Sequence, residues 1–168
     1  MSHAELERSD LEELSASWLA GWEVGAGFAA CCTPDVAYED PLTVDPLDGL
    51  EALERHAERL RRALPDLRLD RSAEPLASGP GEGFACLPWR LVGTHRGGVG
   101  ELPPTGRFLV VHGIHYVELV DGAVRRGRGF FDLHDIAVQL GLMPGRGSLA
   151  EGTLLLLRGF GLRRRGGA

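Results

Sequence analysis

Apolar residues recur at helical spacing in two stretches of the first third of the chain. In residues 5–21 they are Leu6, Leu11, Leu14, Trp18 and Leu19, and in residues 50–64 they are Leu50, Leu53, Ala57, Leu60 and Leu64. This spacing predicts two amphipathic helices. Residues 28–32 predict a short helix between them, which ends before Pro34 because the residue before a proline disfavours helical backbone.

From Leu67 onward the pattern changes to alternation interrupted by turns, and a short extended piece precedes it at residues 36–41. We expect strands at residues 67–75, 84–95 and 107–119, and a last strand after Asp121-Gly122, a strong hairpin signal. Helices followed by a meander of strands predict an α+β architecture. A curved, mainly antiparallel sheet with one face covered by three N-terminal helices leaves a cone whose mouth suits a small-molecule site.

The 168 residues most simply form one domain, at residues 1–146, with an apolar and Arg-rich C-terminal extension at 147–168. The apolar residues of the extension are Leu149, Leu154 to Leu157, Phe160 and Leu162. So many exposed apolar groups would be unusual for a soluble monomer. We therefore expect the extension to pack on the domain or across a homodimer.

Composition and charge exclude several classes of partner. The formal net charge of −6 argues against general affinity for nucleic acid. No apolar run approaches the ~20 residues that cross a bilayer, and residues 1–10 lack the basic and apolar parts of a signal peptide. The three cysteines, Cys31, Cys32 and Cys86, have neither zinc-site nor disulfide spacing. We expect a cytoplasmic protein with reduced thiols, no metal site, and no membrane partner.

The last predicted strand ends in Phe130-Phe131-Asp132 and turns directly into a short helix. If Asp132 faces inward, strand alternation places Phe130 and Arg128 on the same face. Desolvation among aromatic groups would raise the pKa of Asp132 and suit it to general acid or base catalysis, whereas Arg128 would hold it ionised. Asp132 with Asp135 three residues later is also typical of a helix N-cap with an acidic first turn. The spacing leaves both interpretations open.

Two histidines lie in the preceding strand, His112 and His115. They differ by three positions, so they point to opposite faces unless a bulge at Gly113 turns both inward. Val117 and Leu119 share the face of His115, so we expect this histidine inside, where it would orient Asp132 or share a proton with it. A packed histidine with no chemical role is the alternative.

Aromatic residues from several segments could line a cavity for a flat ligand, although each could equally be core. They are Trp18, Trp22, Tyr38, Trp89 and Tyr116. Tyr38 and Asp40 precede a proline-rich loop and could reach the mouth of the cone. Asp40 could instead be a turn residue before Pro41.

Five motifs occur in a recognisable order: Tyr38-Glu39-Asp40-Pro41, followed by Gly49 and a helix that ends at Leu64-Pro65-Asp66-Leu67; Gly93-Thr94-His95-Arg96-Gly97; Pro103-Pro104-Thr105-Gly106-Arg107; Asp121-Gly122; and Asp132 before Gln139-Leu140-Gly141-Leu142. Together they resemble the SnoaL-like polyketide cyclase family of the NTF2-like superfamily. The resemblance implies a cone-shaped barrel that is usually oligomeric and has a hydrophobic pocket.

The resemblance also implies a function. Cyclases of the family close a ring of an antibiotic precursor by intramolecular aldol condensation without metal or cofactor, and related enzymes would be lyases or isomerases of aromatic polyketide-like molecules. An aspartate at the end of the last long strand serves as acid/base, a position that Asp132 matches, whereas Arg128 stands where members commonly have an aromatic residue. A non-catalytic small-molecule binder and an epoxide hydrolase-like enzyme using Asp40 and Arg128 remain alternatives.

Overall fold

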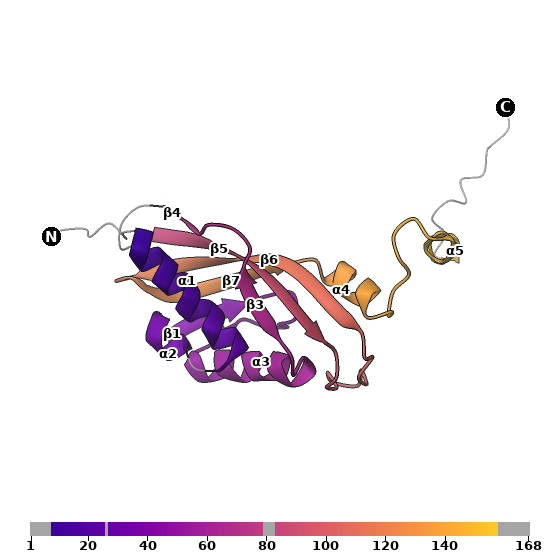
Figure 1. Ribbon diagram of the computed structural model, residues 1–168, viewed down its shortest axis with the longest axis horizontal. Coiled ribbons are helices and arrows are strands. Elements are labelled where there is room, and N and C mark those ends of the chain that lie inside the picture. The colour runs from indigo at the N-terminus through magenta and orange to yellow at the C-terminus, as the bar shows by residue number, and fades with distance from the viewer. Residues whose placement is uncertain (1–7, 26, 79–82, 158–168) are drawn as a thin grey trace, which may run out of the picture.

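Helices from the first part of the chain cover one side of a curved sheet in the computed structural model, which describes residues 8–25, 27–78 and 83–157 (Figure 1). They are α1 (Arg8–Glu23), α2 (Phe28–Cys31) and α3 (Leu50–Ala63). The three predicted N-terminal helices are thus confirmed within the described residues. The second ends one residue earlier than predicted because Cys32 already belongs to the first strand.

The sheet is mainly antiparallel. Its strands are β1 (Cys32–Glu39), β2 (Leu47–Asp48), β3 (Arg68–Arg71), β4 (Leu76–Ser78), β5 (Gly83–Thr94), β6 (Phe108–Val120) and β7 (Ala123–Phe131). They are ordered β2-β1-β7-β6-β5-β3, with β4 also on β5, so the sheet does not close. The exception is the parallel pairing of β1 with β7. This pairing places the first strand of the chain beside the last one.

Turn chemistry explains two of the boundaries. Asp121 and Gly122 both have positive φ, 50° and 77°, which is the geometry of the two-residue hairpin that this pair predicted. Gly49, with φ of 81°, precedes α3. A side chain would strain the backbone there, whereas glycine adopts this conformation freely. The strand predicted at 67–75 is shorter in the structure, where β3 ends at Arg71, and β4 follows beyond the predicted segment; both strands pair with β5.

The core lies between the helices and the concave side of the sheet. Its largest fully buried side chains are Trp18, Phe28, Tyr38, Leu53 and Leu87. The apolar stripe of α1 that the sequence predicted provides the tryptophans, and Leu53 and Ala57 of α3 pack beside them. Aromatic rings are therefore the largest side chains of a core that is otherwise mainly aliphatic.

Two short helices follow the sheet. In α4 (Leu133–Gln139), the Gln139 amide donates to the Val110 carbonyl at 2.8 Å and accepts from the Val110 N–H at 2.9 Å. Since β7 pairs with β6 only as far as Gly113, Gln139 satisfies backbone groups that lie beyond the last pair. None of the helices in the described ranges combines the length and hydropathy of a membrane span.

The last helix, α5 (Leu149–Leu157), stands away from the domain at the end of an extended segment (Figure 1). Leu149 and Leu157 are 94% and 80% exposed. The described part of the predicted extension therefore does not cover its own domain in this structure. Packing across a homodimer stays a prediction, and Phe160, Leu162 and the terminal Arg cluster lie outside the described residues.

Candidate active site

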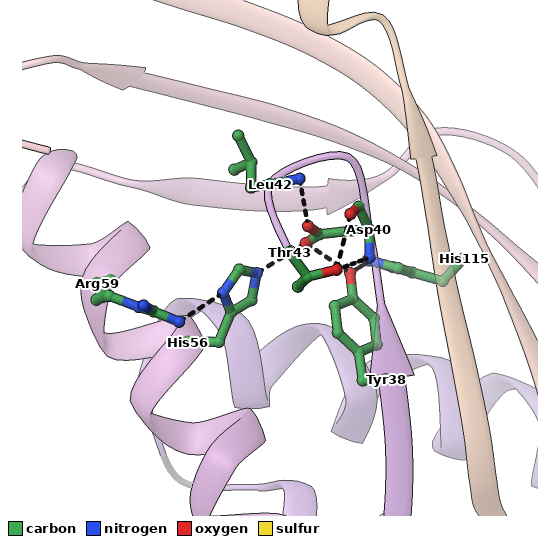
Figure 2. A network of polar contacts seen from close by, with 7 residues as sticks. All are labelled: Tyr38, Asp40, Leu42, Thr43, His56, Arg59 and His115. Carbon is green, nitrogen blue, oxygen red and sulfur yellow. Dashed lines mark hydrogen bonds and ion pairs between the residues drawn. The ribbon is translucent and has the colours of Figure 1, made fainter. Parts of the chain in front are cut away.

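Asp40 follows the last residue of β1 and starts the loop that leads to β2. Its Oδ1 accepts the Leu42 N–H at 2.7 Å, and its carbonyl oxygen accepts the Thr43 N–H at 3.0 Å and the Thr43 hydroxyl at 2.9 Å (Figure 2). The turn role that the sequence allowed for Asp40 is thus confirmed. The same turn holds the carboxylate in place at the end of the strand.

The other carboxylate oxygen of Asp40 joins two more titratable side chains. Oδ2 accepts the Tyr38 hydroxyl at 3.1 Å and lies 2.8 Å from His56 Nε2 (Figure 2). The side chains of Asp40 and His56 are only 4% and 8% exposed. Burial would raise the pKa of Asp40, but hydrogen bonds from His56, Leu42 and Tyr38 act in the opposite direction, and the pKa lies below its ordinary value. Asp40 is therefore a buried carboxylate that remains ionised near neutral pH.

His115 extends this network into the core. Its Nε2 lies 3.3 Å from the Tyr38 hydroxyl, and its ring is stacked on Trp22 with the centroids 5.4 Å apart. Burial lowers the pKa of His115 to about 3, although the charge of Asp40 acts in the opposite direction. Burial, the Asp40 charge and the hydrogen bond to Asp40 raise the pKa of Tyr38 well above its ordinary value. At neutral pH, His115 is neutral and Tyr38 keeps its proton.

A groove of about 370 Å³ lies beside Asp40. One wall is the loop at residues 41–46, and the other is formed by Arg128, Gly129 and Phe130 of β7. A Cβ on Gly129 would lie 2.6 Å from the Tyr38 hydroxyl oxygen and 3.0 Å from Asp40 Cβ. Only glycine leaves room there, so the missing side chain allows the buried network to reach the wall of the groove.

Apart from Asp132, the predicted site residues are divided among three places in the structure. The groove has Asp40, Arg128 and Phe130 along its walls, and the interior holds Trp18, Trp22, Tyr38, Trp89 and His115. His112 is exposed on the other face of β6. The inward orientation of His115 is confirmed. Gly113 keeps regular pairing with both neighbouring strands, so no bulge turns His112 inward as well.

The orientation predicted for the end of β7 was wrong. Phe130 is 51% exposed, and Arg128 is paired with Glu39 on the outer face. Phe131 is the ring that turns inward, with its centroid 5.9 Å from that of Trp89. The reason is steric, because the inward positions before it, Gly127 and Gly129, lie against bulky interior side chains.

Asp132 itself is the N-cap of α4. Its Oδ1 accepts the Asp135 N–H at 2.9 Å, its Oδ2 accepts from Arg146 at 2.9 Å, and its side chain is 49% exposed. The backbone hydrogen bond from Asp135 and the charge of Arg146 lower the pKa of Asp132. The structure therefore shows the cap interpretation, and Asp132 is not buried beside a histidine as the alternative expected.

Sequence reasoning missed His56 and its neighbour Arg59. His56 lies on the buried stripe of α3, between Leu53 and Ala57, which is a polar residue in an otherwise apolar pattern and could have been noticed. Arg59 Nη2 lies 3.2 Å from His56 Nδ1. Within the described ranges, no three His, Cys, Asp or Glu side chains are grouped so that they could hold a metal ion.

Several solved structures share this fold. TsrD from Streptomyces laurentii has a TM-score of 0.70 and 23% identity, covering 83% of this chain and 100% of that one. IdmH from Streptomyces antibioticus, described as a candidate polyketide cyclase, has a TM-score of 0.64 and 19% identity, covering 80% and 99%. A protein with a ketosteroid isomerase-like fold from Catenulispora acidiphila, in complex with trimethylamine, has a TM-score of 0.61 and 15% identity, covering 78% and 94%.

At these identities the structural matches show the fold alone. Among curated proteins, the sequence has no significant match. The family of SnoaL-like polyketide cyclases, which the motifs indicated, matches residues 14–140. This range includes the buried network and the groove and covers most of the 168 residues, so the chain belongs to the SnoaL-like polyketide cyclase family.

Proposed function

We propose that the protein is an acid/base cyclase or isomerase in which Asp40 removes a proton from a carbon next to a carbonyl group. The observation that carries this proposal is a buried, ionised carboxylate on the wall of a groove. Among the described residues, two donors occupy Oδ2, whereas Oδ1 accepts only the Leu42 N–H. A carboxylate oxygen has two lone-pair sites, so Oδ1 retains one that can accept the substrate proton.

The substrate would be an aromatic, polyketide-like molecule lying in the groove against the exposed ring of Phe130. Asp40 takes the C–H proton, and the electron pair of that bond forms an enolate. In a cyclisation, the enolate carbon attacks a second carbonyl of the same molecule, and the resulting alkoxide takes up the proton that Asp40 removed. In an isomerisation, Asp40 returns its proton to another carbon. The chain's own side chains move the proton in both reactions.

Asp132 is the competing base, because motif order matches it to the family's acid/base residue. Asp40→Asn and Asp132→Asn distinguish the two, since asparagine can still accept the Leu42 N–H at position 40 and is a good N-cap at position 132. The assay is deuterium uptake from D2O next to the carbonyl of a panel of aromatic ketones. We expect a loss of about 10²–10⁴-fold in Asp40→Asn and a near-parent rate in Asp132→Asn. The reverse pattern would assign the base to Asp132.

A non-catalytic binder is the second candidate, because Phe130 and the apolar residues Pro41, Val44 and Pro46 offer a surface for an aromatic ring. Native mass spectrometry of freshly purified protein would detect a retained ligand, which favours this candidate if no exchange occurs. The epoxide hydrolase alternative lacks support, since Arg128 is paired with Glu39 and Asp132 with Arg146. The acid–Arg–acid arrangement it needs is not formed by the described residues.

The proposal includes a homo-oligomer in the cytoplasm that serves antibiotic biosynthesis. The exposed leucines of α5 support self-association, because a second copy of the chain could cover them. The same mass spectra report the size of the assembly. A chain ending at Arg146 should yield a smaller assembly than the full chain.

A further inference from the structure

We infer that Arg59 and His56 are positioning residues for Asp40, with Arg59 fixing the tautomer of His56 that donates a hydrogen bond to the carboxylate. The catalytic consequence rests on the proposed function of Asp40 as the base. The hydrogen-bond assignment rests on geometry alone. The chain of contacts runs from Arg59 through His56 to Asp40 (Figure 2).

The two neighbours of His56 determine where its proton lies. A guanidinium group only donates hydrogen bonds, so His56 Nδ1, 3.2 Å from Arg59 Nη2, must be the acceptor. An ionised carboxylate only accepts, so His56 Nε2, 2.8 Å from Asp40 Oδ2, must be the donor. The neutral ring with its proton on Nε2 satisfies both contacts. A doubly protonated ring would direct the Nδ1 proton at the cation of Arg59.

On the other side of Asp40, the hydrogen bonds also point toward the carboxylate. Tyr38 has one hydroxyl proton and donates it to Asp40 Oδ2. The Tyr38 oxygen must therefore accept from His115 Nε2, 3.3 Å away, and His115 Nδ1 has no hydrogen-bond partner among the described residues. His56 thus donates to Asp40 directly, and His115 supports the carboxylate through Tyr38. This arrangement keeps a buried carboxylate ionised.

The groups facing the network come from four elements besides the Asp40 turn. Arg59 lies one helical turn after His56 on α3, so both share one helix face. Tyr38 comes from β1 and His115 from β6. The uncharged ring of Trp22, on α1, has its centroid 5.9 Å from that of His56. Arg59 is the charged side chain that contacts His56 directly at Nδ1. Removing the Arg59 guanidinium should therefore allow His56 to adopt other tautomers while the core remains packed.

The first test measures tautomers without any substrate. The ¹⁵N NMR spectrum of the histidine rings in the full chain should show His56 at neutral pH with a proton on Nε2 and none on Nδ1. In Arg59→Met, we expect ring forms with a proton on Nδ1 to appear. A proton on Nδ1 in the parent, or an unchanged spectrum in Arg59→Met, would overturn the assignment.

The second test compares two replacements of His56. The Gln amide can donate where Nε2 did, whereas Leu fills space without donating, and circular dichroism confirms folding of each variant. The ¹³C signal of the Asp40 carboxyl group should show that His56→Leu raises the pKa of Asp40 by at least about 1, with His56→Gln close to the parent. The acid limb of the deuterium-exchange rate should move by the same amount.

The outcomes separate the two claims. Equal pKa values of Asp40 in the Leu and Gln variants would overturn the positioning role of His56. A shifted pKa of Asp40, together with full exchange activity in Asp40→Asn, would refute the proposed function while leaving the hydrogen-bond assignment intact. If His56→Leu fails to fold, the other two variants decide the question. An Asp40 pKa well above the parent value in His56→Gln, or an unchanged His56 tautomer in Arg59→Met, would then overturn the positioning role.

Discussion

Two aspartates follow the ends of neighbouring strands, Asp40 after β1 and Asp132 after β7, and the fold treats them in opposite ways. Asp40 is buried and accepts hydrogen bonds from a loop, a strand and a helix. Asp132 is half-exposed and is held by its own helix and by Arg146. Both have a lowered pKa, so a shifted pKa alone does not distinguish a buried network from a surface cap.

The difference in burial comes from the side chains that the fold packs around the end of each strand. Residues next to Asp132 in the sequence are aromatic, yet neither phenylalanine buries the carboxylate. Leu42 and Tyr38 are also local to Asp40, but His56 is brought to the carboxylate by α3, and His115 of β6 reaches the network through Tyr38. Local composition is therefore a poor guide to the depth of a charged side chain, and long-range packing determines it.

The largest expected effect is acid destabilisation through His115. The unfolded chain protonates this histidine near pH 6.5, but the folded pKa is about 3. Between these values the unfolded state binds more protons, so the free energy of unfolding falls as pH is lowered through this window, by several kcal/mol in total. The lowered pKa values of Asp40 and Asp132 change the free energy of unfolding only below about pH 4, where these carboxylates become protonated in the unfolded chain.

Urea unfolding from pH 7 to pH 4 measures this slope. His115→Gln, which removes the titrating ring but can still donate to Tyr38, should flatten it. The exposed His112 provides the matched control, and His112→Gln should leave the slope as in the parent. An unaltered slope in His115→Gln would mean that His115 is not the group responsible.

A smaller effect is expected from adding a methyl group beside Asp40. In Gly129→Ala, the new Cβ would lie 2.6 Å from the Tyr38 hydroxyl oxygen, so Tyr38 or β7 must shift. Overpacking of this kind costs about 1–3 kcal/mol, and exchange activity should fall because the Tyr38 contact to Asp40 is disturbed. Gly152→Ala, where the Cβ meets open space, is the control. Equal unfolding free energies for the two variants would contradict the crowding at Gly129.

The smallest effect is expected at the exposed cap. Asp132→Ala removes the acceptor for the Asp135 N–H and should lower the melting temperature by about 2–4 °C, whereas Asp132→Asn keeps the cap and should stay near the parent. Arg146→Gln should change little, because exposed ion pairs contribute little. Differential scanning calorimetry measures all three. A large loss in Asp132→Asn would show that its charge matters more than the cap does, and the contrast with Asp40 would weaken.

Features with a local cause followed from the sequence. The period of apolar residues located α1 and α3, Asp121-Gly122 located the hairpin, and Asp132 with Asp135 carried the cap signature. The family was also readable from the order of short motifs. The helices, the hairpin and the cap each depend on residues close together in the sequence, where backbone geometry and side-chain spacing are nearly independent of the rest of the fold.

Other features depended on contacts between distant residues. Tyr38 and His115 are 77 positions apart, Asp40 and His56 are 16 apart, and the parallel pairing of β1 with β7 brings Glu39 to Arg128. The face that β7 turns inward was decided by the bulky side chains opposite Gly127 and Gly129. The sequence by itself determined the main helices, the long strands and the family. Only the tertiary structure showed that Asp40 is buried and Asp132 half-exposed, because burial of a charge depends on which groups the fold packs around it.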